Sequence, residues 1–458
     1  MAETKFERKP GEKMRLGMFI SAEGHHVAGW RHPDVRAGAG QDINHYVNIA
    51  RLSERGLFDM LFKADSQSTF GPDDINNWKR TTSACQFEPI TMFAALAMVT
   101  KNIGLVSTSS TTYGDPFHVA RFFASLDLIS GGRAGWNLVT SSAASEAFNF
   151  SLDAHVPHAD RYERAAEFVQ VVMGLWECWE PDAFLGDKKE GLYFDPKKLH
   201  FLNHKGKHFS VRGPLTVMRS PQNRPVIVQA GQSEDGRDLA AETAEVLFAV
   251  QQRIEPAREF YADIKRRLVE KGRAPGSLLI MPGVMPVIGR TVKEAEERFD
   301  ELNKLIHPEQ GIPVLSDMVG TDLSKYPLDG PLPPKPPINT QQGRQAVVYD
   351  LAARENLTIR QLYQKLTGQR AHRVVVGTAE TIADDLELWF KTGGADGFNI
   401  MPLTFLQGLE DIVDKLIPEL QRRGLFRTEY ESNTLRGNLG LHTPVARKLK
   451  VNVPAPAP

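Results

Sequence analysis

The sequence predicts an α/β protein, a (β/α)8 TIM barrel with long insertions after the fourth and seventh strands. Short apolar runs rich in β-branched residues alternate with longer amphipathic runs, and eight short runs occur in order along the 458 residues. A chain of this length suits one barrel with insertions. The alternative architecture is an open doubly wound sheet. No G-x-G-x-x-G follows the first run, which argues against a dinucleotide-binding sheet.

The elements follow one another as βα units. Asp42 and Asp115 occupy N-cap positions, and Pro89 and Pro116 suit the first turn of a helix. We expect strands at 16–20, 60–64, 103–107, 134–140, 226–230, 246–250, 278–287 and 397–401. We expect helices at 43–55, 89–100, 116–129, 159–177, 236–244, 256–270 and 379–391, with a last helix at 409–422 packed on the barrel.

Two stretches are too long for a minimal barrel, 141–224 and 289–376. Each follows the carboxyl end of a strand, so each is expected to fold over the barrel mouth, as functional lids do. The second stretch contains a Pro-rich run at 327–337 and a helical segment near 342–366. The predicted organisation is therefore a flexible arm at 1–13, a barrel at 14–426 and a C-terminal extension at 427–458 whose end is disordered.

Composition excludes several classes of function. The formal net charge is −1 and no long basic run occurs, so nothing indicates a nucleic-acid or anionic-membrane partner. No segment resembles a signal peptide or a membrane helix, and a cytoplasmic protein is expected. The two cysteines, Cys85 and Cys178, lack metal-ligand spacing and are interpreted as buried thiols.

Polar side chains cluster where three of the predicted strands end. Asp65 closes the second strand, six consecutive hydroxyl residues at 107–112 close the third, and Asn137 lies within the fourth. Strand ends of one barrel converge on its catalytic rim. Each position also has a simpler explanation: a helix cap for Asp65, satisfied loop groups for the hydroxyls, and a cross-strand contact for the buried amide.

A phosphate site is indicated after the fifth strand. Ser233 begins a helix there, with Gly231 before it and Gly236 and Arg237 after it. Exposed helix N–H groups and the helix dipole attract an anion, and Arg237 can add a charge-assisted bond. Simple capping by Ser233 is the alternative. Upstream, His158 and Tyr162 are four residues apart at the start of a helix and so share one face.

A further cluster follows the first strand: His25, His26, Trp30, Arg31 and His32. Three histidines suggest a metal site, but no carboxylate or further histidine stands at ligand spacing, so we predict none. Trp30 offers a flat apolar wall. The histidines can bind substrate or transfer a proton.

In register, these motifs resemble the bacterial-luciferase-like flavin monooxygenases, in the nitrilotriacetate, EDTA and dibenzothiophene-sulfone monooxygenase branch. The motifs are GHHVAGWRHP from Gly24, FKAD ending at Asp65, GWNLVTS from Gly135, HADRY from His158 and GQSEDGR from Gly231. The resemblance covers about 14–426. It implies that FMN contacts Asp65, Thr108, Asn137, His158, Tyr162, Ser233 and Arg237, that His158, His25 and His26 are catalytic, and that Trp30 and Arg31 line the substrate pocket.

The function implied is an FMNH2-dependent monooxygenase of a two-component system. A separate NAD(P)H:flavin oxidoreductase supplies the reduced flavin, which forms a C4a-(hydro)peroxyflavin and oxygenates a small organic substrate, xenobiotics included. The same resemblance implies a homodimer or homotetramer. Two alternatives stay open: a deazaflavin-dependent oxidoreductase of the same superfamily, and a non-catalytic flavin-binding protein. The sequence does not identify the substrate.

Overall fold

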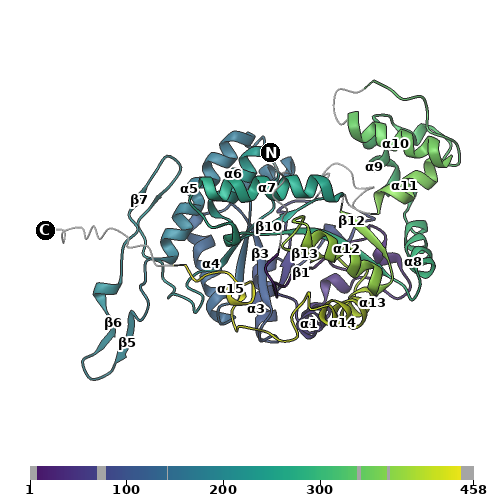
Figure 1. Ribbon diagram of the computed structural model, residues 1–458. Helices are drawn as coiled ribbons and strands as arrows, with labels where there is room; N and C mark the ends of the chain where they lie inside the picture. Colours follow the sequence, from purple (N-terminus) through teal and green to yellow (C-terminus); the bar gives the residue numbers. More distant parts are fainter. Residues whose placement is uncertain (1–7, 70–78, 142, 338–341, 369–371, 445–458) are drawn as a thin grey trace, which may run out of the picture.

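The computed structural model describes residues 8–69, 79–141, 143–337, 342–368 and 372–444. Nine parallel strands form one sheet in the order β10-β9-β4-β3-β2-β1-β13-β11-β12, and pairing between β10 and β11 closes eight of them into a barrel. This confirms the predicted fold class (Figure 1). The barrel strands are β1 (Arg15–Phe19), β2 (Met60–Lys63), β3 (Gly104–Ser110), β4 (Ala134–Val139), β9 (Val226–Gln229), β10 (Val246–Ala249), β11 (Leu279–Ile288) and β13 (Gly397–Ile400).

The ninth strand, β12 (Arg373–Gly377), was not expected from the sequence. It lies outside the closed ring and pairs only with the second half of β11, with Val284 opposite Arg373 and Ile288 opposite Gly377. The first half of β11 pairs with β10. A strand of ten residues thus serves both the barrel and an added edge.

The helices begin and end close to the predicted positions. Asp42 and Asp115 accept hydrogen bonds from backbone N–H groups of the helices they precede, and Pro89 and Pro116 occupy first turns, as predicted. The helices around the barrel are α1 (Ile43–Arg55), α3 (Pro89–Ala97), α4 (Pro116–Ile129), α5 (His158–Trp176), α6 (Glu234–Thr243), α7 (Ile254–Glu270), α12 (Ala379–Lys391), α13 (Gln407–Asp411) and α14 (Ile417–Arg422). A π-helical turn, Ile412–Leu416, joins the last two.

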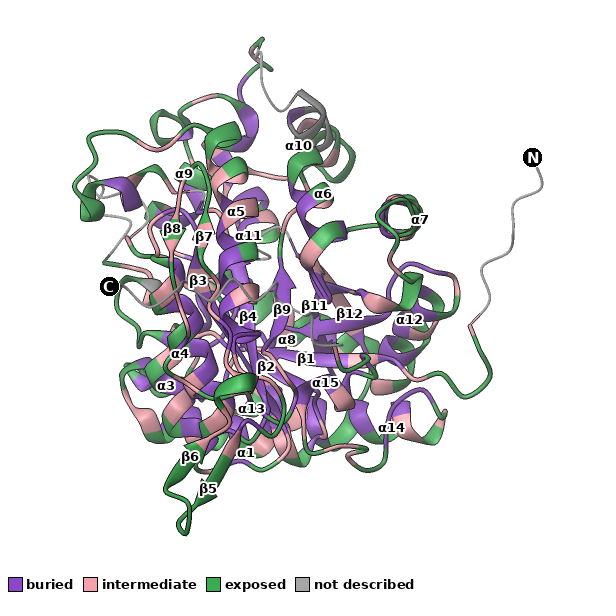
Figure 2. Ribbon diagram, turned by 90° about the vertical axis from the view of Figure 1, so that its left-hand side faces the viewer, coloured by how far each residue is buried: buried purple, intermediate pink, exposed green. Residues whose placement is uncertain are grey.

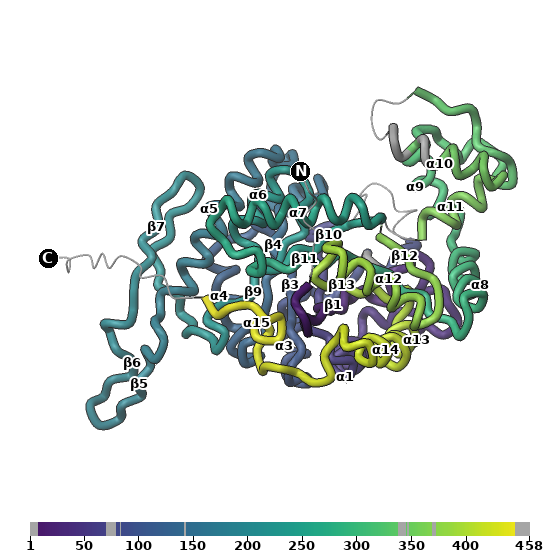
Figure 3. The backbone as a smooth tube through the Cα atoms, in the orientation of Figure 1, coloured from purple at the N-terminus to yellow at the C-terminus, as the bar shows by residue number. Residues whose placement is uncertain are grey.

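Both long insertions carry secondary structure of their own. After β4 come a 3-10 helix at Ala144–Phe150, helix α5 and two hairpins, β5 (Phe184–Asp187) with β6 (Leu192–Phe194) and β7 (His204–Lys205) with β8 (Ser210–Val211). The hairpins form an arm on one side of the barrel (Figures 1 and 3). After β11, a helical lobe stands on the other side, made of α8 (Val292–Lys304), α9 (Pro308–Val319), α10 (Gln342–Glu355) and α11 (Ile359–Thr367).

The barrel interior is filled by side chains, and its amino-terminal end is closed by the C-terminal segment. Phe62, Val106 and Met281 form one buried cluster with Leu435 and Leu439 from and just after α15 (Leu435–Asn438). Strands in the middle of Figure 2 are accordingly buried. Part of the extension predicted at 427–458 is therefore core, whereas its expected disordered end, from 445 on, lies outside the described residues.

Two smaller expectations need correction. β3 extends to Ser110, beyond the predicted end at 107, so Ser107–Ser110 lie within the strand beside residues 136–139 of β4. Cys85 is exposed rather than buried, while Cys178 is buried as predicted. Among the described residues, no helix is long and apolar enough to cross a membrane.

Candidate functional site

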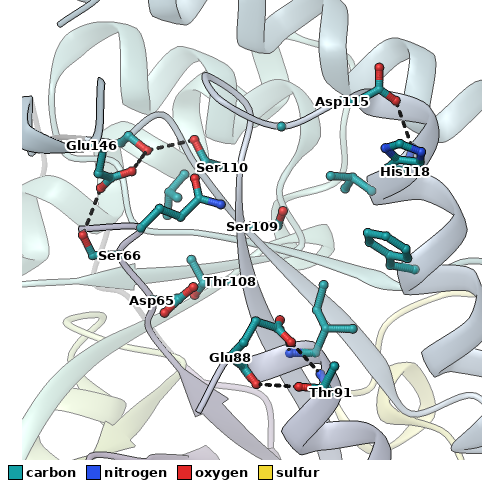
Figure 4. Close-up of a pocket in the computed structure, with 17 residues that line it drawn as sticks. Asp65, Ser66, Glu88, Thr91, Thr108, Ser109, Ser110, Asp115, His118 and Glu146 are labelled. Atoms are coloured by element: carbon teal, nitrogen blue, oxygen red, sulfur yellow. Dashed lines mark hydrogen bonds between the residues drawn. The ribbon is translucent and has the colours of Figure 1, made fainter. Parts of the chain in front are cut away.

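Two adjoining cavities, of about 380 and 310 Å³, open at the carboxyl-terminal end of the barrel. The first runs from the ends of β2, β3 and β4 outward between α3 and α4 (Figure 4). The second runs from the same place toward the start of α6. A common wall lines both cavities and consists of Asp65, Ser66, Val139, Ser141 and Glu146.

Two predicted flavin contacts, Thr108 and Asn137, are joined across adjacent strands. Thr108 Oγ1 donates to the backbone oxygen of Lys63 at 2.7 Å, and Asn137 Nδ2 donates to Thr108 Oγ1 at 2.8 Å. The expected cross-strand contact therefore exists, but it uses only the NH2 group of the Asn137 amide and not its oxygen. Asn137 Oδ1 is buried and has no hydrogen-bond partner among the described residues. Buried acceptors are normally satisfied, so this oxygen is an exception; Asn137 itself lines neither cavity, while its partner Thr108 lines the first.

Asp65 has an unusual electrostatic environment. It is half-buried, and burial raises the pKa of its carboxyl to about 6. Lys63 opposes this shift, while Glu88 and, less strongly, Glu146 add to it by charge repulsion. A carboxyl that changes charge near neutral pH at a cavity wall is suited to proton transfer.

Glu146 is a site residue that the sequence reasoning did not single out. It lies in the 3-10 helix after β4, is buried, and accepts hydrogen bonds from Ser66 Oγ at 3.1 Å and Ser141 Oγ at 2.6 Å. Ser141 Oγ in turn lies 2.8 Å from Ser110 Oγ. One carboxylate thus connects the ends of β2, β3 and β4. Only the fold brings these hydroxyls together, although the acid inside the apolar stretch Ala-Ser-Glu-Ala-Phe was visible in the sequence.

The predicted phosphate site lies at the far end of the second cavity. Ser233 caps α6 by accepting from the N–H of Gly236 at 3.2 Å, and its hydroxyl donates to Tyr162 Oη at 3.4 Å. Gly231 and Gly236 both line the cavity and approach closely: a Cβ on either would meet the other's Cα at 3.0 Å. Only glycine therefore leaves this backbone unobstructed.

Neighbouring charges at this helix start are held away from the cavity. Arg237 donates to Gln232 O and pairs with Asp263 at 3.1 Å, so it lines neither cavity. Glu234 pairs with Arg267 and so is drawn toward α7. Of the two acids in the first turn, Glu234 thus has a cationic partner outside the site, whereas Asp235 lies beside His158.

His158 and Tyr162 share one helix face, as predicted. Their ring centroids are 4.7 Å apart, and Tyr162 lines the second cavity. His158 itself is half-exposed, with a side-chain exposure of 51%, and its Nδ1 lies 3.3 Å from Asp235 Oδ2. The imidazole therefore sits at the outer edge of the site.

The cluster after β1 lies where the barrel meets the helical lobe. His25 Nε2 bonds to Phe19 O at 2.9 Å, and its ring packs against the Phe19 ring. His26 Nδ1 accepts from the N–H of Ala28, and its Nε2 lies 3.1 Å from Asn303 Oδ1 of α8. A neutral imidazole protonated on Nε2 satisfies both bonds.

Trp30 and Arg31 continue this junction. Trp30 is half-buried, and its indole nitrogen has no partner among the described residues. Arg31 is exposed and donates to Leu305 O, just after α8. The structure thus separates the predicted residues into two groups: one around the two cavities, and one that joins the β1 loop to the lobe. Within the described ranges, no three His, Cys, Asp or Glu side chains form a metal-binding group.

Comparison with known proteins decides the family. Residues 14–396 match the family described as Luciferase-like monooxygenase. The chain belongs to this family. It is 49% identical to the N-acetyl-S-(2-succino)cysteine monooxygenase of Bacillus subtilis, covering 96% of this chain and 99% of that protein. It is 47% identical to nitrilotriacetate monooxygenase component A of Aminobacter aminovorans, with 94% and 97% covered. The protein is therefore an enzyme, a monooxygenase of the luciferase-like flavin family.

Solved structures agree with this assignment. The EDTA monooxygenase of a Chelativorans species superimposes with a TM-score of 0.79 at 32% identity, covering 94% of this chain and 99% of that one. A riboflavin lyase, solved with modified FMN and riboflavin, gives 0.79 at 32% identity with 95% and 98% covered. An F420-dependent secondary alcohol dehydrogenase gives 0.56 at 16% identity, with 89% and 99% covered, and so shares only the fold.

Proposed function

We propose that this luciferase-like monooxygenase is the oxygenase component of a two-component system and uses FMNH2 delivered by a separate NAD(P)H:flavin oxidoreductase. The observation that carries the proposal is the second cavity. It places a glycine-lined, serine-capped helix start at one end and the strand-end wall of polar side chains at the other. A flavin mononucleotide has the same two ends, a phosphate and a polar ring.

The residues present fit this cofactor. Gly231, Ser233 and the first turn of α6 would hold the phosphate, with Tyr162 beside it. The unpartnered Asn137 Oδ1 would accept from a ring N–H, and Thr108 and Asp65 would flank the ring. When bound and reduced, the flavin supplies the activation of O2, and the protein contributes orientation and exclusion of water.

Other residues receive roles by their position. Arg237, bound to Gln232 O, would hold the turn before Ser233 rather than contact phosphate. His158, at the outer edge, would act in proton transfer together with Tyr162. On the substrate side, His25, His26, Trp30 and Arg31 would contact the substrate where the β1 loop meets the lobe, with the histidines available for proton exchange.

The names of two relatives support a system of more than one protein. The nitrilotriacetate monooxygenase relative is one component of its system. Another relative, 45% identical over 95% of this chain, is one of the subunits of the pristinamycin IIA synthase of Streptomyces pristinaespiralis. We propose a small organic substrate, a homodimer or homotetramer, and a cytoplasmic location where the reductase has its nicotinamide donor.

The deciding experiment is reconstitution with FMN, NADH, O2 and a purified flavin reductase. Candidate substrates are N-acetyl-S-(2-succino)cysteine, nitrilotriacetate and dibenzothiophene sulfone, and product per O2 consumed is measured beside H2O2. We expect substrate-dependent product with FMNH2 and none with reduced deazaflavin. Hydride transfer from the deazaflavin without O2 would favour a deazaflavin-dependent oxidoreductase. Stoichiometric flavin binding without turnover of any compound would favour a flavin-binding protein.

A further inference from the structure

The wall between the two cavities contains more charge than the flavin site requires. Asp65 lies on this wall, and three charged side chains affect the pKa of its carboxyl. They are Lys63 in β2, Glu88, which precedes α3, and Glu146 in the 3-10 helix after β4. Figure 4 shows Asp65 between Glu88 and Glu146. The role of this arrangement is not explained by cofactor binding alone.

Lys63 is a buried amine, not the surface charge it would be on an average strand end. Its residue exposure is only 1%, and Nζ donates to Gln86 Oε1 at 2.6 Å. Residues two apart along an extended chain lie on the same side, which places Lys63 near Asp65. Burial lowers the pKa of Lys63 to about 8, and Asp65 opposes that shift.

Glu146 reaches Asp65 through the adjacent residue. Ser66, which follows Asp65, donates its hydroxyl hydrogen to Glu146 Oε1, and Ser141 donates to Oε2. Within the part of the chain that the structure describes, no lysine, arginine or histidine forms an ion pair with Glu146. Its carboxylate is therefore stabilised by hydroxyls rather than by an ion pair, and acts on Asp65 as a like charge.

Glu88 is also the N-cap of helix α3. Both of its carboxylate oxygens accept backbone N–H groups at the start of α3, from Ile90 at 2.6 Å and Thr91 at 2.9 Å. These bonds fix the carboxylate where it lines the first cavity. Asp65 thus has one buried cation and two fixed anions around it, each on a different element.

We propose that Asp65 is a proton donor to the ligand in these cavities, and that Lys63, Glu88 and Glu146 are positioning residues that balance its proton. The two glutamates disfavour the Asp65 carboxylate, so the carboxyl keeps its proton to a higher pH than an ordinary aspartate does. When the proton leaves Asp65 Oδ for an acceptor atom of the ligand, the ammonium of Lys63 stabilises the carboxylate that remains. Only the identity of the ligand rests on the proposed function.

Titration of Asp65 in the flavin-free protein tests this proposal. The C=O band of the protonated carboxyl is followed by infrared difference spectroscopy from pH 4 to pH 9, and Asp65→Asn identifies the band. Replacing Lys63 by Met removes the cation and should move the midpoint up by about one pH unit or more. Glu146→Gln removes an anion and should move the midpoint down.

Glu88→Gln is a second test of the downward shift, and thermal unfolding of each variant shows whether it is folded. If loss of the helix cap prevents Glu88→Gln from folding, Lys63→Met and Glu146→Gln remain decisive. Displacement in opposite directions supports the proposal. Unchanged midpoints, or the same direction in both, overturn it. Because no flavin is present, failure here is distinguishable from a failure to bind FMN, which would count against the proposed function.

Discussion

Buried charged side chains are arranged differently at the two ends of the barrel. At the amino-terminal end, Arg436 forms a two-oxygen contact with Glu245, and Arg427 pairs with Asp59 beside it. Leu435 and Leu439, on and just after the helix that contains Arg436, belong to the buried apolar cluster of the barrel interior. At the carboxyl-terminal end, the charged side chains around the cavities are balanced against one another, and Asn137 Oδ1 has no partner among the described residues.

Strand β4 shows this difference along its length. On β4, Gly135 near the closed end packs against Leu435, Asn137 faces the interior, and Ser141 just past the strand belongs to the cavity wall. The buried carboxylates at the closed end, Asp59 and Glu245, each pair with an arginine, because an unpaired buried charge would cost stability. At the open end, Asn137 Oδ1 is left without a partner among the described residues. Stability and chemistry thus occupy opposite ends of the same strands.

The largest effect is expected at the closed end. Arg436→Ala leaves Glu245 buried without its main partner, so the free energy of unfolding should fall by about 3–5 kcal/mol in denaturant titration. FMN affinity per folded molecule should not change, because the site lies at the other end. A matched control replaces both partners, Arg436→Met with Glu245→Leu, and should regain much of the loss. A weakened FMN affinity in folded Arg436→Ala would show that the two ends are coupled.

At the open end, Ser233→Glu should lower FMN affinity and leave the free energy of unfolding largely unchanged. A further negative charge at the start of α6 repels phosphate, and the substitution removes a hydroxyl, so FMN binding should weaken by about 2 kcal/mol in a fluorescence titration. Thr378→Glu is the control, since Thr378 caps α12 in the same way, but no residue at the start of α12 lines either cavity. Equal FMN affinity of both variants would place the phosphate elsewhere.

Asp65→Asn should stabilise the protein at neutral pH. The carboxyl has a pKa of about 6 in the native protein and about 3.9 when unfolded. Between these two pH values, native Asp65 holds its proton while the unfolded chain releases it. The wild type therefore loses stability as pH rises from about 4 to about 6. At pH 7 the variant should be more stable by about 1–2 kcal/mol, discounted for partial exposure.

The pH dependence is the check on that prediction. Denaturant unfolding of both proteins is measured at pH 4, 5, 6 and 7, and the difference should shrink to nothing at the acidic end. A constant difference at every pH would mean that the amide acts through packing and not through charge.

The smallest change in stability is expected for His158→Ala, because the side chain is half-exposed. Product per O2 should fall and H2O2 should rise, since proton transfer at the outer edge of the site is lost. Asp235→Asn is the matched control: it keeps the imidazole but removes the carboxylate beside it, and should produce a weaker form of the same uncoupling. Wild-type product yield in His158→Ala would remove this residue from the mechanism.

Local sequence signals were sufficient for most of the framework. Helices α1, α4 and α12 begin and end where expected, because caps such as Asp42 and Asp115 and the first-turn Pro116 act within a few residues. The match of GWNLVTS and HADRY to one family depended on residue identity alone. That match also gave the enzyme class, which the comparisons confirm.

What the sequence by itself determined is therefore the barrel, its helix boundaries and the family, because periodicity and capping act between near neighbours. Tertiary structure alone decided that β12 joins β11, that Arg237 turns to Asp263, and that Lys63 is buried. It also brought Glu146 to Ser66, 80 residues away in the chain. Such partners depend on which distant segments pack together, and burial and charge balance at the cavity wall exist only after that packing has occurred.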